Sequence, residues 1–244
     1  MRNLKLTVEY DGTNYCGWQK QKNSISIQQL IEDKLSKILN HKVKLKATGR
    51  TDAGVHAKQQ IVNLFTSSKI PLKNLKKAIN SVLPDDIAVK KIMHVSNDFD
   101  AQYSPKTKIY RYSIYIGKNK MVFDRKYVAH YPISLDVNAI RQGAMHMIGK
   151  HDFSCFRSSN SSTKTSVRTV KKIDVKVKGD YIIIDIEADG FLYNMVRIIV
   201  GTLLEVGIGK RKPSSIKELI ESKKRTLAGL TAKAHGLCLL KVKY

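Results

Sequence analysis

The chain has 244 residues, 42% hydrophobic and 26% charged, which is enough to bury a core in an ordinary globular protein without disulfides. No apolar run is long enough to cross a bilayer, so the sequence excludes a membrane protein. Lys and Arg total 44 against 20 Asp and Glu, a formal charge of +24 spread over the whole chain, which favours a polyanionic partner such as nucleic acid.

Three cysteines, Cys16, Cys155 and Cys238, lie far apart and form no CxxC pair. Neither a disulfide framework nor a zinc site is indicated, so we expect reduced, structural thiols. Residues 1–12, MRNLKLTVEYDG, alternate apolar and polar side chains, whereas a signal peptide needs an unbroken apolar block. These features lead us to expect a cytoplasmic protein.

The first half of the chain alternates between strand-like and helix-like patterns. Residues 4–10 alternate apolar and polar side chains, which predicts a half-buried strand. Ser26, with Gln29 three positions later, is typical of a helix N-terminus and predicts a helix to about Asn40. The other elements expected here are strands over residues 42–46, 61–65 and 87–95 and a helix between Pro71 and Pro84.

The second half repeats this order. Gly179 and Asp180 predict a hairpin turn between two β-rich segments. The other elements expected are strands over residues 110–116, 173–177, 181–187 and 237–244, helices over 137–148 and 193–206, and a short helix over 215–222. Both halves therefore read βαββαβ.

This order predicts an α+β protein built from two ferredoxin-like subdomains, because βαββαβ is the split βαβ pattern of that fold. We expect the subdomains to share a mixed, mainly antiparallel sheet with helices on one face. Turn-forming residues over 96–105 mark the expected boundary, so the predicted subdomains are residues 1–102 and 103–244.

The segment GRTDAGVHA, residues 49–57, lies between two predicted strands and contains a single acidic residue, Asp52. Arg50 stands two positions before it, and a neighbouring cation favours the ionised form of a carboxylate. An ionised carboxylate is what nucleophilic catalysis requires. The same residues also suit a plain turn in which Asp52 caps an amide and Arg50 binds phosphate, and the loop alone does not decide between the two.

Six segments in the same order resemble the TruA family of tRNA pseudouridine synthases, and together they cover essentially the whole chain. The resemblance is strongest in GRTDAGVHA. The other five are VEYDGTNYCGWQKQ near the N-terminus, KIYRYSIY over 108–115, HDFSCFRSSN over 151–160, FLYNMVRIIVG over 191–201 and AHGLCLLKVKY at the C-terminus.

This resemblance implies the pseudouridine synthase fold and the isomerisation of uridine to pseudouridine. The N1 glycosidic bond of uridine is broken, the uracil rotates, and C5 is joined to the ribose. The resemblance implies that Asp52 is the nucleophile, with attack on ribose C1′ or on uracil C6 left open. It implies no cofactor and no metal.

Roles for further residues also follow from the resemblance. The target base must leave its stack to reach Asp52, and Arg50 is expected both to fill the vacated space or hold phosphates and to pair with Asp52. Tyr110 is expected to stack on the uracil and to remove the C5 proton after rejoining, and Arg197 to form an ion pair with Asp52. The expected substrate-binding residues are Tyr110, Leu237, Arg50 and Thr51.

The resemblance further implies that the partner is tRNA, at positions 38, 39 and 40 of the anticodon arm, and that the protein is a homodimer. The polar segment of residues 158–168 is compatible with a mobile loop that grips RNA or with a linker. A non-catalytic RNA-binding protein with tandem RRM-like units is the alternative, although no RNP1-like segment is present. A zinc deaminase and a dinucleotide-dependent enzyme lack their motifs here.

Overall fold

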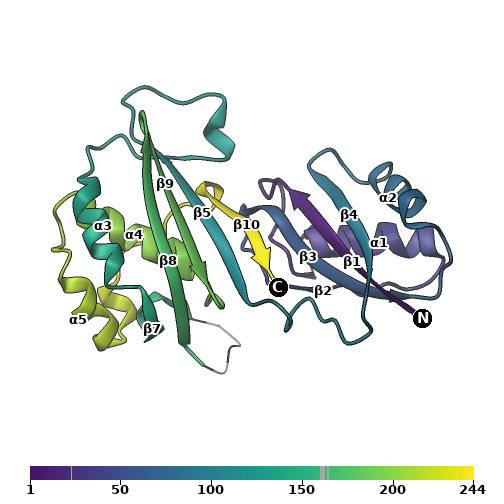
Figure 1. Ribbon diagram of the computed structural model, residues 1–244. Coiled ribbons are helices and arrows are strands. Elements are labelled where there is room, and N and C mark those ends of the chain that lie inside the picture. The colour runs from purple at the N-terminus through teal and green to yellow at the C-terminus, as the bar shows by residue number, and fades with distance from the viewer. Residues whose placement is uncertain (23, 160–162, 164) are drawn as a thin grey trace. The chain divides into compact units, whose positions relative to one another are not determined.

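The computed structural model describes residues 1–244 except 23, 160–162 and 164. Two compact units make up the chain (Figure 1): the first contains residues Met1–Lys106 and Cys238–Tyr244, and the second contains Thr107–Leu237. The division falls close to the expected boundary, but the last strand is grouped with the first unit. Within the described residues no helix is long and apolar enough to cross a membrane.

The first unit has the predicted βαββαβ order. Antiparallel pairs join β1 to β3 and to β4, and β2 to β3, while β10 pairs with β3 in parallel, which gives the strand order β4-β1-β3-β10. Helix α2 contacts β4 and α1. The elements are β1 (Arg2–Tyr10), α1 (Ile27–Leu39), β2 (Lys46–Ala47), β3 (His56–Thr66), α2 (Leu72–Asn80), β4 (Ile87–Val95) and β10 (Leu237–Lys243).

Helix α1 begins and ends where the sequence predicts. The Ser26 side chain accepts a hydrogen bond from the backbone N–H of Gln29, which satisfies one of the unpaired donors at the helix start. Asn40 ends the helix in the left-handed conformation, with a φ of 54°. Between these caps, α1 buries one apolar face, made of Ile27, Ile31, Leu35 and Leu39.

Strand β2 is shorter than predicted, and the reason lies in α1. The backbone N–H of Leu45 donates to Glu32 Oε1 at 2.8 Å, and that of Val43 donates to Ser36 Oγ at 2.9 Å. These donors are therefore bound to helix side chains and take no part in a strand ladder. Val43 and Leu45 are buried even so, which explains why their alternation resembles a strand.

Strand β10 is held in the first unit by more than its short ladder with β3. The backbone N–H of Val242 donates to Gln59 Oε1 at 3.0 Å, and the hydroxyls of Tyr244 and Thr48 lie 3.1 Å apart. The Tyr244 ring also packs near Phe99, with 5.2 Å between ring centroids. The C-terminal segment thus completes the sheet of a unit whose other residues all precede position 107.

The second unit is also antiparallel in its main ladders. Strand β9 pairs with β5 and β8, and β8 pairs with β7, in the order β5-β9-β8-β7, while the short β6 pairs with β5 in parallel. Figure 1 shows α3, α4 and α5 gathered beside these strands. The elements are β5 (Thr107–Tyr115), β6 (Ala129–His130), α3 (Val137–Met145), β7 (Gly149–Asp152), β8 (Val167–Lys178), β9 (Tyr181–Ala188), α4 (Met195–Gly207) and α5 (Ser215–Ser222).

The predicted hairpin at Gly179 is confirmed. Gly179 has a φ of +56° between β8 and β9, a conformation that glycine adopts at little cost. Alternate residues of β9, Ile182, Ile184 and Ile186, are fully buried. Helix α4 is apolar nearly all round, as expected for a helix in the centre of a core.

The α+β class and the mixed, mainly antiparallel strand pairing are therefore confirmed. The sequence did not predict β6 or β7, strands too short to carry a readable alternation. Part of the segment over 158–168, expected as a loop or linker, lies outside the described residues, and β8 begins within it at Val167.

Candidate active site

The GRTDAGVHA segment forms the loop between β2 and β3. The backbone N–H of Thr48 donates to Ile61 O at 2.9 Å, and Gln60 Nε2 donates to Gly49 O at 2.8 Å. Each of these two hydrogen bonds joins the start of the loop, at Thr48 or Gly49, to a residue of β3. The loop therefore leaves the sheet from a fixed base.

Thr51, the residue before Asp52, is anchored on both its backbone and its side chain. Its hydroxyl shares a 2.8 Å hydrogen bond with the Tyr10 hydroxyl, and its carbonyl accepts the backbone N–H of Trp18 at 3.0 Å. Tyr10 and Trp18 are 3% and 2% exposed, and burial raises the pKa of Tyr10. Two large buried aromatic residues thus set the position of the backbone at Thr51.

Asp52 itself lies in a tight turn. Its carbonyl accepts the N–H of Val55 at 3.1 Å, and Gly54 adopts a φ of +75° within the turn. The side chain of Asp52 is partly exposed, whereas Arg50 is exposed and Thr51 is buried. The loop therefore holds the partly exposed Asp52 on a backbone that is fixed by hydrogen bonds to buried residues.

Gly17 allows the N-terminal segment to reach this loop. A Cβ at Gly17 would lie 2.5 Å from Thr51 O and 3.0 Å from Asp52 C, and the residue has a φ of +102°. Both the close approach and the backbone conformation require glycine. On the far side of the loop, the N–H of Gly12 donates to His56 Nδ1 at 3.0 Å, so the same segment also grips the start of β3.

Tyr110 lies in the middle of β5 in the second unit. It is 7% exposed and packs edge-on against Phe191, with ring centroids 5.1 Å apart and an interplanar angle of 85°. Phe191 comes from the segment between β9 and α4. The ring of Tyr110 is therefore fixed in orientation by a second aromatic residue.

Lys108 shares the Tyr110 face of β5, because the two residues are two positions apart on one strand. Burial lowers the pKa of Lys108 to about 8, and the nearby Arg168 lowers it further while Asp189 opposes the shift. A pKa this far below the ordinary lysine value means that keeping the Lys108 ammonium group charged lowers the stability of the folded protein. The Tyr110 region thus combines aromatic packing with confined positive charge.

Arg197 projects from the first turns of α4 and is partly exposed. Its Nε donates to Ala232 O at 2.7 Å, and its Nη1 donates to Asn194 Oδ1 at 2.8 Å. Asn194 precedes α4 in the left-handed conformation, with a φ of 60°. Two hydrogen bonds from different nitrogens fix the plane of the guanidinium group.

Leu237 follows a turn that packs on Tyr112. The Tyr112 hydroxyl donates to Lys233 O at 2.8 Å, and a Cβ at Gly236 would lie 2.7 Å from the Tyr112 ring. Tyr112 is 1% exposed, as expected of a core tyrosine, and Leu237 is 5% exposed at the start of β10. Tyr112, two positions after Tyr110, thus supports the backbone that leads to Leu237.

The structure places the expected site residues on two sets of elements. Arg50, Thr51 and Asp52 lie on one loop of the first unit, and Tyr110, Arg197 and Leu237 belong to the second. The sequence did not indicate that the loop is supported by Tyr10, Gly17 and Trp18. The glycine beside Trp18 was the available signal, since an isolated glycine often marks a close backbone approach.

Comparisons with known proteins identify the family of the chain. A family model described as tRNA pseudouridine synthase matches residues 6–104 and 144–244. The tRNA pseudouridine synthase A of Thermoanaerobacter pseudethanolicus is 46% identical over 244 residues, and that of Caldicellulosiruptor saccharolyticus is 49% identical over 244 residues; both alignments cover 100% of each chain. The chain therefore belongs to the tRNA pseudouridine synthase family, a family of isomerases.

Among solved structures, a chain of the archaeal box H/ACA sRNP Nop10-Cbf5 complex resembles this protein weakly. It is 14% identical, the match covers 82% of this chain and 43% of that one, and the TM-score is 0.37. A TM-score this low supports no argument, so the family membership rests on the sequence relatives.

Proposed function

We propose that this protein isomerises uridine to pseudouridine in the anticodon stem-loop of tRNA, at positions 38, 39 and 40. The observation that carries the proposal is the loop over residues 49–57, in which Thr51 is anchored by Tyr10 and Trp18 and the next residue presents the carboxylate. A formal charge of +24 suits an RNA substrate. The family membership supports the reaction type.

Asp52 is the proposed nucleophile. It attacks ribose C1′, which displaces N1, or uracil C6, after which the N1–C1′ bond breaks. The uracil then rotates, C5 forms the new bond to C1′, and the bond between Asp52 and the substrate breaks, which restores the carboxylate. The proton lost from C5 is balanced by the proton gained at N1, so no co-reactant is consumed. A loop that is hydrogen-bonded at its base suits this role, because a nucleophile must be held in one orientation before the substrate arrives.

The other site residues are proposed to handle the flipped base. Arg50, exposed beside Asp52, fills the space that the extruded nucleotide leaves or holds its phosphates. Tyr110 stacks on the uracil and removes the C5 proton, and Leu237 packs on the base. Thr51, the residue before Asp52, also contributes to substrate binding. Arg197 is proposed to pair with the Asp52 carboxylate.

Three further features of the family are proposed here for this chain. The protein works as a homodimer, with one tRNA bound across both subunits. It recognises the anticodon arm by shape and charge, since a surface rich in lysine contacts phosphates irrespective of sequence. It acts in the cytoplasm, where its substrate tRNA is found.

The test is to incubate the purified protein with an unmodified tRNA transcript and to map pseudouridine chemically, in parallel with Asp52→Asn. Wild type is expected to convert a uridine of the anticodon stem-loop, and the variant to bind the transcript without converting it. Asp180→Asn is the matched control, because Asp180 is an exposed aspartate in the hairpin turn between β8 and β9.

If wild type binds the transcript and leaves every uridine unchanged, the protein is an RNA-binding protein and the enzyme proposal fails. If Asp52→Asn and Asp180→Asn convert uridine equally well, the reaction stands and the nucleophile has been assigned to the wrong residue. Conversion outside the anticodon arm would overturn the proposed site on the tRNA.

A further inference from the structure

Residues 225–232, here called the strap, lie directly on helix α4. A Cβ at Gly201 would collide with the carbonyl oxygen of Leu230, and a Cβ at Gly229 would lie 2.7 Å from the backbone nitrogen of Thr202. The strap and the helix therefore touch backbone to backbone, which only glycine permits at these two positions. No side chain separates them at this point.

Thr202 joins the strap to α4 by a buried hydrogen bond. Its hydroxyl donates to Ile198 O at 2.8 Å and accepts the backbone N–H of Gly229 at 2.9 Å, and the residue is fully buried. Without the hydroxyl, the N–H of Gly229 would be buried with no acceptor from this residue, which is costly in a protein core. The bond therefore sets the register of the strap on the helix.

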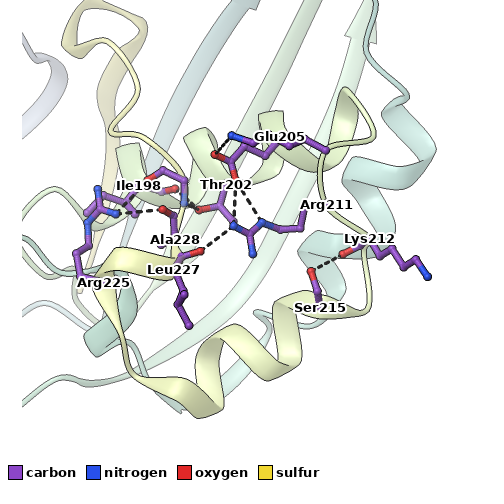
Figure 2. Close-up of polar contacts among 11 residues, drawn as sticks. Ile198, Thr202, Glu205, Arg211, Lys212, Ser215, Arg225, Leu227 and Ala228 are labelled. Carbon is purple, nitrogen blue, oxygen red and sulfur yellow. Dashed lines mark hydrogen bonds and ion pairs between the residues drawn. The ribbon is translucent and has the colours of Figure 1, made fainter.

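Two arginines, Arg225 within the strap and Arg211 outside it, donate hydrogen bonds to strap residues (Figure 2). Arg225 donates from Nη1 to Gly229 O at 3.1 Å and from Nη2 to Thr231 Oγ1 at 3.2 Å. Arg211 donates to Leu227 O at 2.7 Å and pairs with Glu205 of α4, with 3.0 Å between Nη2 and Oε2. Arg225 thus stabilises the strap internally, and Arg211 ties the strap at Leu227 to α4 through Glu205.

The strap ends at Ala232, which contacts Arg197 twice. The backbone N–H of Ala232 donates to Arg197 O at 3.1 Å, and its carbonyl accepts from Arg197 Nε at 2.7 Å. Any shift of the strap along α4 would therefore move the acceptor that orients the guanidinium. Helix α4 alone fixes only the Cα of Arg197, because an arginine side chain has several rotatable bonds beyond it.

We infer that the strap is a positioning element for Arg197 and that Thr202 is the positioning residue that sets it. This inference rests on the proposed function, in particular on the proposed role of Arg197 in catalysis. Thr202 touches no substrate in this account. It acts through Gly229 and the strap on the Ala232 carbonyl, and through that carbonyl on the guanidinium group.

The first test compares Thr202→Val with Thr202→Ser in the full-length protein. Valine keeps the shape and removes the hydroxyl, and serine keeps the hydroxyl. Under single-turnover conditions on an unmodified tRNA transcript, Thr202→Val is expected to lower the rate of pseudouridine formation by about tenfold or more, with transcript affinity unchanged. Thr202→Ser is expected to restore most of that rate.

Two glycine variants separate movement of the strap from general disturbance of α4. Gly201→Ala places a methyl group against Leu230 O, which lifts the strap, and is expected to lower the rate in the same way. Gly143→Ala on α3 is the control. Its Cβ would lie 3.4 Å from Leu203 Cδ2 of α4, which is an ordinary van der Waals contact. Gly143→Ala is expected to keep the wild-type rate.

A double-mutant cycle with Arg197→Lys decides whether Thr202 acts through Arg197. Thr202→Val is expected to lower the rate in the wild-type background and to have almost no further effect in the Arg197→Lys background. If the two losses multiply, Thr202 acts elsewhere and the inference is overturned. If Arg197→Lys itself leaves the rate unchanged, the proposed role of Arg197 fails, which is a separate result from a failure of the strap.

Discussion

The hydroxyl groups of Tyr10 and Thr51 share a 2.8 Å hydrogen bond in the buried interior beneath the Asp52 loop. Tyr10 is the last residue of β1 and Thr51 directly precedes Asp52, so this bond connects a central strand to the proposed nucleophile. The Asp52 loop is therefore supported by the sheet, and its stability is linked to that of the core.

Tyr10→Phe is expected to lower both stability and activity. The variant removes one buried hydrogen bond, which costs about 1 kcal/mol of unfolding free energy, and it releases the Thr51 side chain. Urea unfolding measures the first effect and single-turnover pseudouridine formation the second. Tyr15→Phe, which loses a hydroxyl bond to Asp86, is the control and is expected to lose stability with little change in rate. Equal losses of rate in both variants would refute the proposed link to Asp52.

Gly17→Ala is expected to lower the stability of the protein by more than the strain of its positive φ alone accounts for. The positive φ costs about 1–2 kcal/mol for a non-glycine residue, and the new Cβ would in addition press on Thr51 O. Gly179→Ala is the comparison, because Gly179 also has a positive φ but has open space around its Cβ position. Thermal unfolding should show a clearly larger loss for Gly17→Ala. Similar losses of stability in the two variants would mean that the Asp52 loop can move away from the new Cβ at little energetic cost.

Stability should rise with pH in the range where Lys108 loses its proton. Its pKa is about 8 in the folded protein against the ordinary lysine value of 10.5, so between these values the unfolded chain binds more protons than the folded protein. Unfolding therefore becomes harder as pH increases across this window, and below about pH 8 the full cost of burying the charge is present. Urea unfolding from pH 7 to pH 10 measures the slope.

Lys108→Met removes this dependence and is expected to flatten the stability profile relative to wild type. The exposed Lys178 provides the control, since Lys178→Met should leave the slope as it is. A profile that stays equally steep in Lys108→Met would show that another group titrates in this range.

Binding of the tRNA transcript should weaken steeply with salt. Phosphate contacts by lysine and arginine release counterions, so the logarithm of the binding constant falls linearly with the logarithm of salt concentration. A filter-binding series in KCl measures the slope, and circular dichroism over the same series checks that the protein stays folded. A flat response would indicate that the charge of +24 has little to do with the substrate.

The elements that could be predicted from the sequence are those whose signal is local. The cap at Ser26, the alternation over 4–10 and the turn at Gly179 each depend on neighbouring residues, and each is confirmed. The strand expected over 42–46 is mostly absent, because Glu32 and Ser36 take its backbone donors. That competition depends on how α1 packs, which periodicity does not encode.

The same distinction holds for the candidate site. The position of Asp52 between two strands could be predicted, since the loop lies between recognisable patterns. The supporting contacts of Tyr10 and Trp18 could not be predicted, because these residues lie 41 and 33 positions from Thr51 in sequence and meet it only in the folded structure. The clamp of Ala232 on Arg197 is equally distant in sequence, and no motif marks the alanine.

The pairing of β10 with β3 has a consequence for biosynthesis. Cys238 pairs with His56, the residue that ends the Asp52 loop, so the partner strand is made only after the ribosome has translated all of Thr107–Leu237. Until then, β3 lacks this neighbour at the edge nearest the loop, and contacts this distant in sequence form slowly. A nascent chain should therefore order its Asp52 loop late, after the intervening unit has had time to fold.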